Sequence, residues 1–363
     1  YSLSSTTGKL TRPDDTTRKS YFEAVIREWE TFKAEGYHNF YGGGYEQLFK
    51  NYSQLILNNQ ESLWEIAFEP NQGQTDNSGM WATYNGPIVD APGSYSGTSS
   101  YMGRANAFFT VLPYWKSFYE SNADGSQKDV RRDVNFVDYA YVWNATTETQ
   151  DKSYTASSIA KSLYRYPGKW RREWMALGFV DPNHTGVNYC PLRYADVVLM
   201  AAEAYNETNN TTEAWKLLND VRQRAEATPI TSANYASLMK APKVYNLDFI
   251  DDSDDAGKFR TALYWERGFE LCYEGQRKYD FLRWGCLGDA LRAAQAYIES
   301  WYPDANEYIN ASTLQSWDPV SWASSNYVAG HNFVDGKHEL YPIPLAEIQS
   351  NAALNGQNNP GFE

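Results

Sequence analysis

Two amphipathic helical patterns follow one another near the middle of the chain. In both, apolar residues recur at steps of three and four, which is the spacing of one buried face on a helix. The first pattern consists of Ala195, Val198, Leu199, Ala202 and Tyr205, and the second of Ala214, Leu217, Leu218, Val221 and Ala225. Between them, Asn210 precedes Glu213 by three residues, as an N-cap precedes its capping partner. The segment therefore predicts an antiparallel helical hairpin.

The same periodicity predicts further helices on both sides of this hairpin. We expect helices over 16–35, 45–57 and 108–119, one or two helices over 258–284, another over 287–301, and a last helical turn that starts at Pro344. Alternating apolar and polar residues predict a strand at 63–69 and a second one within 129–141, after a charged turn. Because no linker splits this series, we expect one continuous, mainly α unit.

Residues 70–105 form a long segment with few helix signals, rich in Gly, Asn, Ser, Pro and Tyr. A loop of this length inside a compact domain is usually either functional or disordered, and the aromatic residues here favour function. Aromatic rings stack on the apolar faces of sugars, and polar side chains bond the hydroxyl groups. If this segment lies on a ligand face, which the family resemblance given below implies, the candidate ligand-binding residues are Trp81 as a platform, Tyr84, Tyr95 and Tyr101 as walls, and Asn77, Asn85, Asp90 and Arg104 as hydrogen-bonding groups. The alternative for each is that it packs the loop down or contacts a partner protein.

Composition narrows the class of protein. A net charge of −13 argues against a nucleic-acid partner, whose phosphates require a basic surface. Aromatic residues make up 16% of the chain and charged residues only 21%, which is typical of a sugar-binding surface and also of a large core with tyrosines at its margins. Three scattered cysteines, Cys190, Cys272 and Cys286, and four separated histidines form no metal-binding motif, so we expect neither a metal nor a cofactor. Cys190 and Cys272 stand in apolar segments that we expect to be helical. No apolar run is long enough to span a bilayer.

Several short motifs, taken in chain order, resemble one family. They are the DVRR turn at 129–132, PGKWR at 167–171, RYADVVLMAAEAYNE at 193–207, AWKLLNDVRQRA at 214–225, ERGFELCYEGQRKYDFLRWG at 266–285, YPIP at 341–344 and QNNPGF at 357–362. In this order and spacing they resemble the SusD/RagB family, the surface glycan-binding lipoproteins of Bacteroidetes. The last motif departs from the family pattern by an extra Asn in Asn358-Asn359 and by Phe362 in place of Tyr. From the resemblance we expect the family's amino-terminal part, with its lipidated cysteine, to lie outside this sequence.

The resemblance implies a mainly α fold of tetratricopeptide-like helical hairpins, with long irregular loops and a few short strands. It implies a single SusD-like domain over 1–363. In that domain 1–69 supplies helices and a strand, 70–128 a loop-rich insertion on the ligand face, and 129–363 the carboxy-terminal region of the family. Family members capture oligosaccharides at the outer face of the outer membrane and pass them to a TonB-dependent, SusC-like transporter. Contact with the membrane would come only through a lipid anchor on the missing amino-terminal part.

Two other classes of function are compatible with the sequence. Glu266, Glu270 and Glu274 recur at steps of four, which places carboxylates roughly 5–6 Å apart, close to the spacing in a retaining glycoside hydrolase. However, neighbouring arginines would lower both pKa values, whereas a general acid needs a raised pKa, so a structural ion-pair network is favoured and no enzyme is expected. Trp170, Arg171 and Arg193 are likewise expected to be structural. The other class is a helical-repeat scaffold or adhesin that binds protein.

Overall fold

The computed structural model describes residues 2–3, 10–57, 60–69, 79–90, 102–106, 111, 115–154, 166–177, 183–239, 252–301 and 332–362. The chain divides into two compact units. The smaller unit comprises Tyr1–Tyr21, Pro242–Asp251 and Arg277–Glu363, and the larger unit comprises Phe22–Ala241 and Asp252–Gln276. These units do not follow the boundaries at 69 and 128 expected from the sequence, and the organisation as a single domain stays a prediction.

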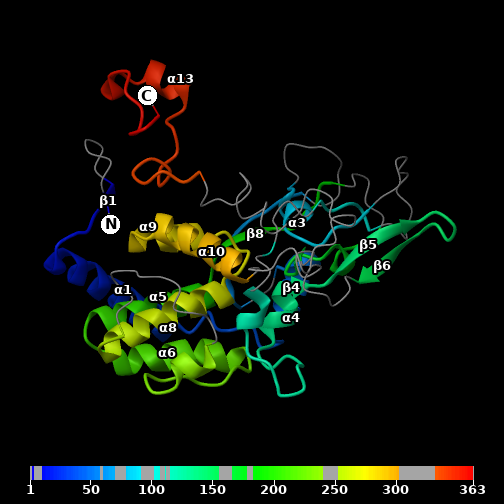
Figure 1. The fold of residues 1–363 in the computed structure, drawn as a ribbon, viewed down its shortest axis with the longest axis horizontal. Helices are drawn as coiled ribbons and strands as arrows, with labels where there is room; N and C mark the ends of the chain where they lie inside the picture. The colour runs from blue at the N-terminus through cyan, green and yellow to red at the C-terminus, as the bar shows by residue number, and fades with distance from the viewer. Residues whose placement is uncertain are drawn as a thin grey trace. The chain divides into compact units, whose positions relative to one another are not determined.

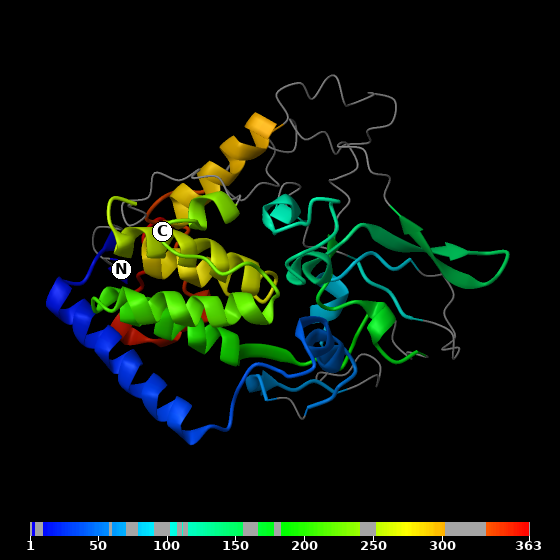
Figure 2. The same ribbon diagram turned by 90° about the horizontal axis from the view of Figure 1, so that it is seen from below.

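Three packed helices form the scaffold of the larger unit (Figures 1 and 2). Helices α5 (Tyr194–Glu207) and α6 (Thr211–Arg224) pack against each other, and α8 (Asp255–Glu270) packs against both. Leu199 and Leu218, which belong to the two predicted apolar faces, are fully buried. Asn210 caps α6, because its Oδ1 accepts a hydrogen bond of 3.3 Å from the Glu213 amide. The predicted helical hairpin is confirmed.

Further helices and short strand pairs accompany this scaffold. Helix α1 (Asp15–Glu35) confirms the first predicted helix, and α2 (Tyr45–Ser53) confirms the second but ends earlier than expected. Strand β3 (Ser62–Ile66) pairs antiparallel with β8 (Tyr189–Arg193), β4 (Phe136–Val137) with β7 (Tyr166–Pro167), and β5 (Tyr139–Asn144) with β6 (Thr149–Tyr154). The remaining short helices of the larger unit are α3 (Trp81–Tyr84), η1 (Trp115–Phe118), α4 (Arg131–Asn135), η3 (Arg172–Trp174) and α7 (Tyr235–Leu238).

The smaller unit contains α9 (Arg277–Trp284), α10 (Leu287–Trp301), α13 (Leu345–Ser350) and η4 (Ala352–Leu354), together with the strand pair β1 (Ser2–Leu3) and β2 (Leu10–Thr11). The segment 258–284 therefore forms two helices. The chain breaks between them at Tyr273 (φ 63°) and Gly275 (φ 86°), whose left-handed backbone cannot continue a helix. Pro344 precedes α13, as predicted.

Three local predictions were wrong or incomplete. Within the predicted helix at 108–119, the described residues contain only the 3-10 turn η1, and the rest of that segment lies outside the described residues. The charged turn at 129–133 is partly helical, since α4 begins at Arg131, whose backbone amide (3.0 Å) and side chain (2.9 Å) both donate hydrogen bonds to Asp129. Cys190, expected in a helix, lies in strand β8.

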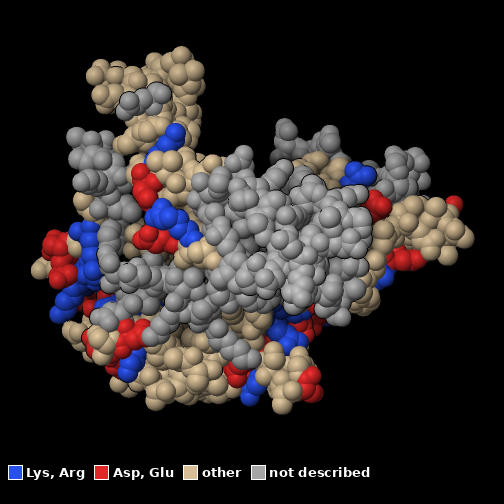
Figure 3. Space-filling view, in the orientation of Figure 1, with Lys and Arg blue, Asp and Glu red and all other residues tan. Residues whose placement is uncertain are grey.

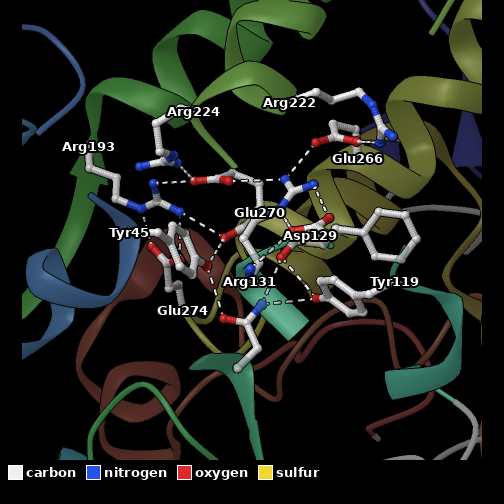
Figure 4. A network of polar contacts seen from close by, with 12 residues as sticks. Tyr45, Tyr119, Asp129, Arg131, Arg193, Arg222, Arg224, Glu266, Glu270 and Glu274 are labelled. Carbon is white, nitrogen blue, oxygen red and sulfur yellow. Dashed lines mark hydrogen bonds and ion pairs between the residues drawn. The ribbon is translucent and has the colours of Figure 1, made fainter. Parts of the chain in front are cut away.

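Figure 4 shows a network of charged side chains buried in the larger unit, with Glu270 near its centre. The Glu270 carboxylate accepts hydrogen bonds from Arg193 at 2.6 Å, from Arg131 at 3.2 Å and from Arg224, and it is completely shielded from solvent. A buried charge is tolerated only when it is paired in this way. Burial alone would raise the pKa of the Glu270 carboxyl, but Arg224, Arg193 and Arg131 outweigh burial and hold that pKa well below its usual range.

The same network joins elements that are distant in sequence. Glu266, one turn before Glu270, pairs with Arg131 at 2.6 Å and with Arg222 of α6 at 2.8 Å. Glu274 pairs with Arg193 at 2.6 Å and with Lys169 at 2.5 Å. The network therefore ties α4, α6, α8 and the end of β8 together, and it confirms the structural interpretation of the three glutamates.

Candidate functional site

The hairpin formed by β5 and β6 lies at the end of the larger unit opposite to α5, α6 and α8 (Figures 1 and 2). Its turn is closed by Asn144, whose Oδ1 accepts the Thr146 amide at 3.0 Å and whose amide donates to Asp151 at 2.7 Å. Successive side chains of a strand point to opposite faces, so the register puts alternate residues on one side. On that side Tyr139 lies opposite Tyr154, Tyr141 opposite Lys152, and Trp143 opposite Gln150. These six residues are called the aromatic face.

One ring of the aromatic face is open to solvent. Tyr154 is 70% exposed, and its ring meets the buried Tyr139 ring edge-on at a centroid distance of 5.6 Å. An exposed ring supported from one side can stack on the apolar face of a sugar without first being ordered. The aromatic face therefore offers a preformed stacking surface.

A shared carboxylate holds two tyrosines of this face in place. Tyr139 and Tyr141 both donate their hydroxyl protons to Glu173, which follows the first residue of η3. Lys152 lies 3.2 Å from the same carboxylate, and its Nζ is 3.9 Å from the centre of the Tyr139 ring. Burial and the hydrogen bond to Glu173 raise the pKa of the Tyr141 hydroxyl above its usual range, because both favour the protonated form that donates to this carboxylate. The arrangement fixes the ring orientations.

Two segments of the long predicted loop pack against the hairpin. Val89 bridges to Ala105 on one side and to Tyr141 of β5 on the other. Gln150 joins the same segments to β6, because its amide donates to the carbonyl of Asp90 at 2.7 Å and to that of Gly103 at 3.0 Å. The structure thus brings parts of the 70–105 region to the aromatic face.

Three of the predicted site residues lie on or next to α3. Trp81 packs against Trp170 at a ring-centre distance of 5.4 Å and against Tyr189 at 4.8 Å, so these two rings partly bury it. Tyr84 is half-buried and donates to the Met80 sulfur. Asn85 is only 2% exposed, and its amide donates to the Tyr273 carbonyl at 2.7 Å. The structure gives Trp81 and Asn85 packing roles, and their contact with a ligand stays a prediction.

The remaining predicted residues divide into two groups. Asp90 lies beside β5, because its backbone amide donates to the Tyr141 carbonyl at 2.8 Å, and its side chain is exposed. Arg104 is half-buried and precedes Ala105, which bridges to Val89. Both therefore lie close to the aromatic face. Asn77, Tyr95 and Tyr101 lie outside the described residues.

Sequence reasoning missed the aromatic face itself. The strand in 129–141 was expected, and the alternation of Tyr139, Tyr141 and Trp143 was the signal that one side of it is aromatic. The partner strand β6 was not expected, because its residues are mostly exposed and carry no apolar alternation. Glu173 could not be found from sequence, since it contacts the tyrosines across more than 30 residues.

The described part of the chain contains no cluster of three or more His, Cys, Asp or Glu side chains placed to hold a metal ion. The acidic run at 251–255 contributes a helix cap, because Asp254 accepts the Gly257 amide at 2.7 Å. Within the described ranges, no helix combines the length and apolar character needed to cross a bilayer. In the view of Figure 3, the described basic and acidic side chains are intermingled.

The class of this protein is defined by its fold. A mainly α scaffold carries short strand pairs and an aromatic loop region. The chain belongs to the SusD family, whose model matches residues 60–362. It is 28% identical over 311 residues to SusD-like protein P2 of Formosa agariphila, an alignment that covers 84% of this chain and 48% of that protein.

Solved structures share the fold. A SusD homolog from Bacteroides thetaiotaomicron superposes with a TM-score of 0.70 at 25% identity, covering 95% of this chain and 60% of that one. Surface glycan-binding protein A from Bacteroides fluxus superposes with a TM-score of 0.56 at 17% identity, covering 96% of this chain and 60% of that one. The predicted fold class is confirmed. The chain spans about half the length of the curated relative and three fifths of the solved structures.

Proposed function

We propose that this chain binds oligosaccharides through the aromatic face and the adjoining segments 79–90 and 102–106. The observation that carries the proposal is the exposed Tyr154 ring, braced by Tyr139 and surrounded by hydrogen-bonding groups. Membership of the SusD family supports it, and one protein with the same fold is named a surface glycan-binding protein. The chain would hold a sugar ring against Tyr154 while Asp90, Arg104 and Lys152 bond its hydroxyl groups.

We further propose that the whole protein acts at the outer face of the outer membrane, where a lipid anchor holds it beside a TonB-dependent, SusC-like transporter. The transporter would receive the captured oligosaccharide. This part of the proposal is supported by family membership and by the motif resemblance. Co-purification of the full-length protein with its transporter from detergent-solubilised membranes tests it, and recovery of the protein alone would contradict it.

The proposed role is capture without hydrolysis. The hydrolase alternative depends on Glu266 and Glu270, which are completely buried and paired with arginines. A general acid needs a raised pKa and contact with the substrate, whereas the pKa of Glu270 is lowered and its oxygens face guanidinium groups. These glutamates are therefore unsuited to cleave a glycosidic bond.

The expected affinity is modest. One aromatic stack contributes roughly 1 kcal/mol, and a few such contacts with hydrogen bonds correspond to dissociation constants from the millimolar to the micromolar range. Fast release follows from weak binding, which suits a protein that hands its ligand on.

The function is tested by calorimetric titration with a panel of soluble neutral and acidic polysaccharides, with reducing ends assayed in the same samples. We expect saturable heat with at least one member and no new reducing ends. New reducing ends would overturn capture without hydrolysis. A flat titration across the panel would favour the alternative of a protein-binding scaffold.

The site is tested by Tyr154→Ala, which removes the exposed ring without opening the core. We expect binding of the responding glycan to weaken by about 5-fold to 10-fold, the equivalent of one ring stack. Tyr37→Ala is the matched control, because Tyr37 is also exposed (78%) and lies outside the aromatic face. Equal affinity of the wild-type protein and both variants would contradict the placement of the site.

A further inference from the structure

Arg104 differs from the other shielded arginines of the larger unit. It is half-buried, yet among the described residues its guanidinium takes part in no ion pair or side-chain hydrogen bond. Arg131, Arg193 and Arg222 all pair with carboxylates within 2.8 Å. A chain of net charge −13 does not lack carboxylates, yet none of the described ones pairs with Arg104. A free guanidinium at this position is therefore an available binding group.

Arg104 is held next to the aromatic face by its backbone. Its carbonyl accepts a hydrogen bond from the Arg172 Nε at 2.9 Å, and the neighbouring Gly103 carbonyl accepts one from Gln150 of the aromatic face at 3.0 Å. The next residue, Ala105, bridges to Val89. These contacts hold the main chain of Arg104 beside the aromatic face and leave its side chain uncommitted among the described residues.

Several cationic side chains lie at the aromatic face and the segments beside it. Glu173 is shared by Lys152 at 3.2 Å and by Arg171 at 3.8 Å, so one carboxylate faces two cations. Arg104 adds a further positive charge, and the exposed Asp90 adds one negative charge. Of these five side chains three are positive and two are negative, although the chain as a whole is acidic.

We propose that the glycan bound at the aromatic face is acidic, and that Arg104 pairs with a carboxylate or sulfate ester carried by the sugar. The planar guanidinium matches the two oxygens of either group, and hydrogen bonds between charged partners are stronger than those to neutral hydroxyls. Lys152 adds attraction at longer range. This inference rests on the proposed function and names the class of ligand that the site takes.

Two matched ligand pairs test the inference by calorimetry with the same chain. One pair is oligogalacturonate and its methyl ester, which differ in the carboxylate, and the other is carrageenan oligosaccharide and its desulfated form. We expect the charged member of one pair to bind at least about 10-fold tighter than its neutral partner, and the responding pair identifies the group. Raising the salt concentration from about 0.05 to 0.5 M should weaken only the charged member, because salt screens the ion pair.

Variants assign the effect to Arg104. Arg104→Gln should remove the preference for the charged member, and Arg104→Lys should retain part of it. Arg27→Gln is the matched control, since it removes one positive charge from an exposed position on α1. Circular dichroism and the urea midpoint confirm that each variant is folded, which we expect because the Arg104 side chain has no structural partner among the described residues.

The outcomes separate this inference from the proposed function. Equal or tighter binding of the neutral members, or of neutral glycans alone, overturns the inference and leaves glycan capture standing. If Arg104→Gln still binds the charged member of a pair more tightly than the neutral member, the role of Arg104 is overturned. Failure of both pairs and of the whole polysaccharide panel contradicts the proposed function as well.

Discussion

The buried network predicts that Glu270 contributes strongly to the free energy of unfolding, although it lies outside the proposed binding site. The perturbation is Glu270→Gln, which keeps the shape of the side chain and removes its charge. Three arginines, Arg131, Arg193 and Arg224, then lose a fully buried counter-charge. Breaking a buried ion pair from one side costs about 3–5 kcal/mol, because a desolvated charge is left uncompensated.

The expected loss of folding free energy in Glu270→Gln lies near the lower end of that range. The Gln side-chain oxygen still accepts a hydrogen bond, and the arginines keep other carboxylates, such as Glu274 at 2.6 Å from Arg193 and Asp129 at 2.7 Å from Arg131. A loss of about 3 kcal/mol is a large part of the 5–15 kcal/mol that usually stabilises a folded protein. With a urea dependence of about 3 kcal/mol per molar, the unfolding midpoint should fall by about 1 M.

Urea unfolding followed by far-UV circular dichroism measures this shift. Glu46→Gln is the matched control, because Glu46 forms an exposed pair with Lys50 at 3.1 Å and such pairs contribute about 0–1 kcal/mol. If Glu270→Gln moved the midpoint no further than Glu46→Gln, the network would not hold the scaffold together and the reasoning from buried charge would fail.

Three other predictions concern the scaffold. The lowered pKa of Glu270 means that its stabilising contribution is complete above the unfolded pKa of about 4.3 and is lost as the pH falls further. The urea concentration at the unfolding midpoint should therefore decrease as the pH is lowered below about 4.5, and this decrease should be less steep in Glu270→Gln. Gly168→Ala should lower stability by about 1–3 kcal/mol, because the new Cβ would lie 2.3 Å from the Val134 carbonyl oxygen. Its thermal midpoint is compared with that of Gly42→Ala, where nothing lies within 4 Å, and an equal shift would refute the clash. Asn210→Ala should lower the free energy of unfolding by about 1 kcal/mol, because α6 loses its N-cap, and an unchanged urea midpoint would rule that out.

The helical scaffold could be predicted from sequence because its information is local. Residues on one helix face recur at fixed steps, so α1, α5, α6 and α10 followed from apolar spacing alone. The three glutamates of 266–274 were correctly interpreted as structural because arginines stand near them in the sequence. Their actual partners, including Arg131 and Arg193, could not be identified, since the pairing distances are set by the fold.

The candidate site could be predicted only in part. The 70–105 region was expected to reach the ligand face, and the structure places Asp90 and Arg104 beside the aromatic face. Trp81 was chosen as the platform because it is a large ring in a polar segment. Local sequence could not show that Trp170 and Tyr189, both far along the chain, pack against it. An aromatic residue in a loop does not reveal from its neighbours whether another segment covers it.

Hydrogen exchange measured by mass spectrometry, with and without a saturating glycan from the panel, tests the central claim most directly. It reports in one experiment whether a glycan binds and which backbone amides it protects. We predict slower exchange in β5, β6 and the segments 79–90 and 102–106, with α5, α6 and α8 unchanged. Protection confined to the helical scaffold, or protection absent from the hairpin at a saturating glycan concentration, would contradict capture at the aromatic face.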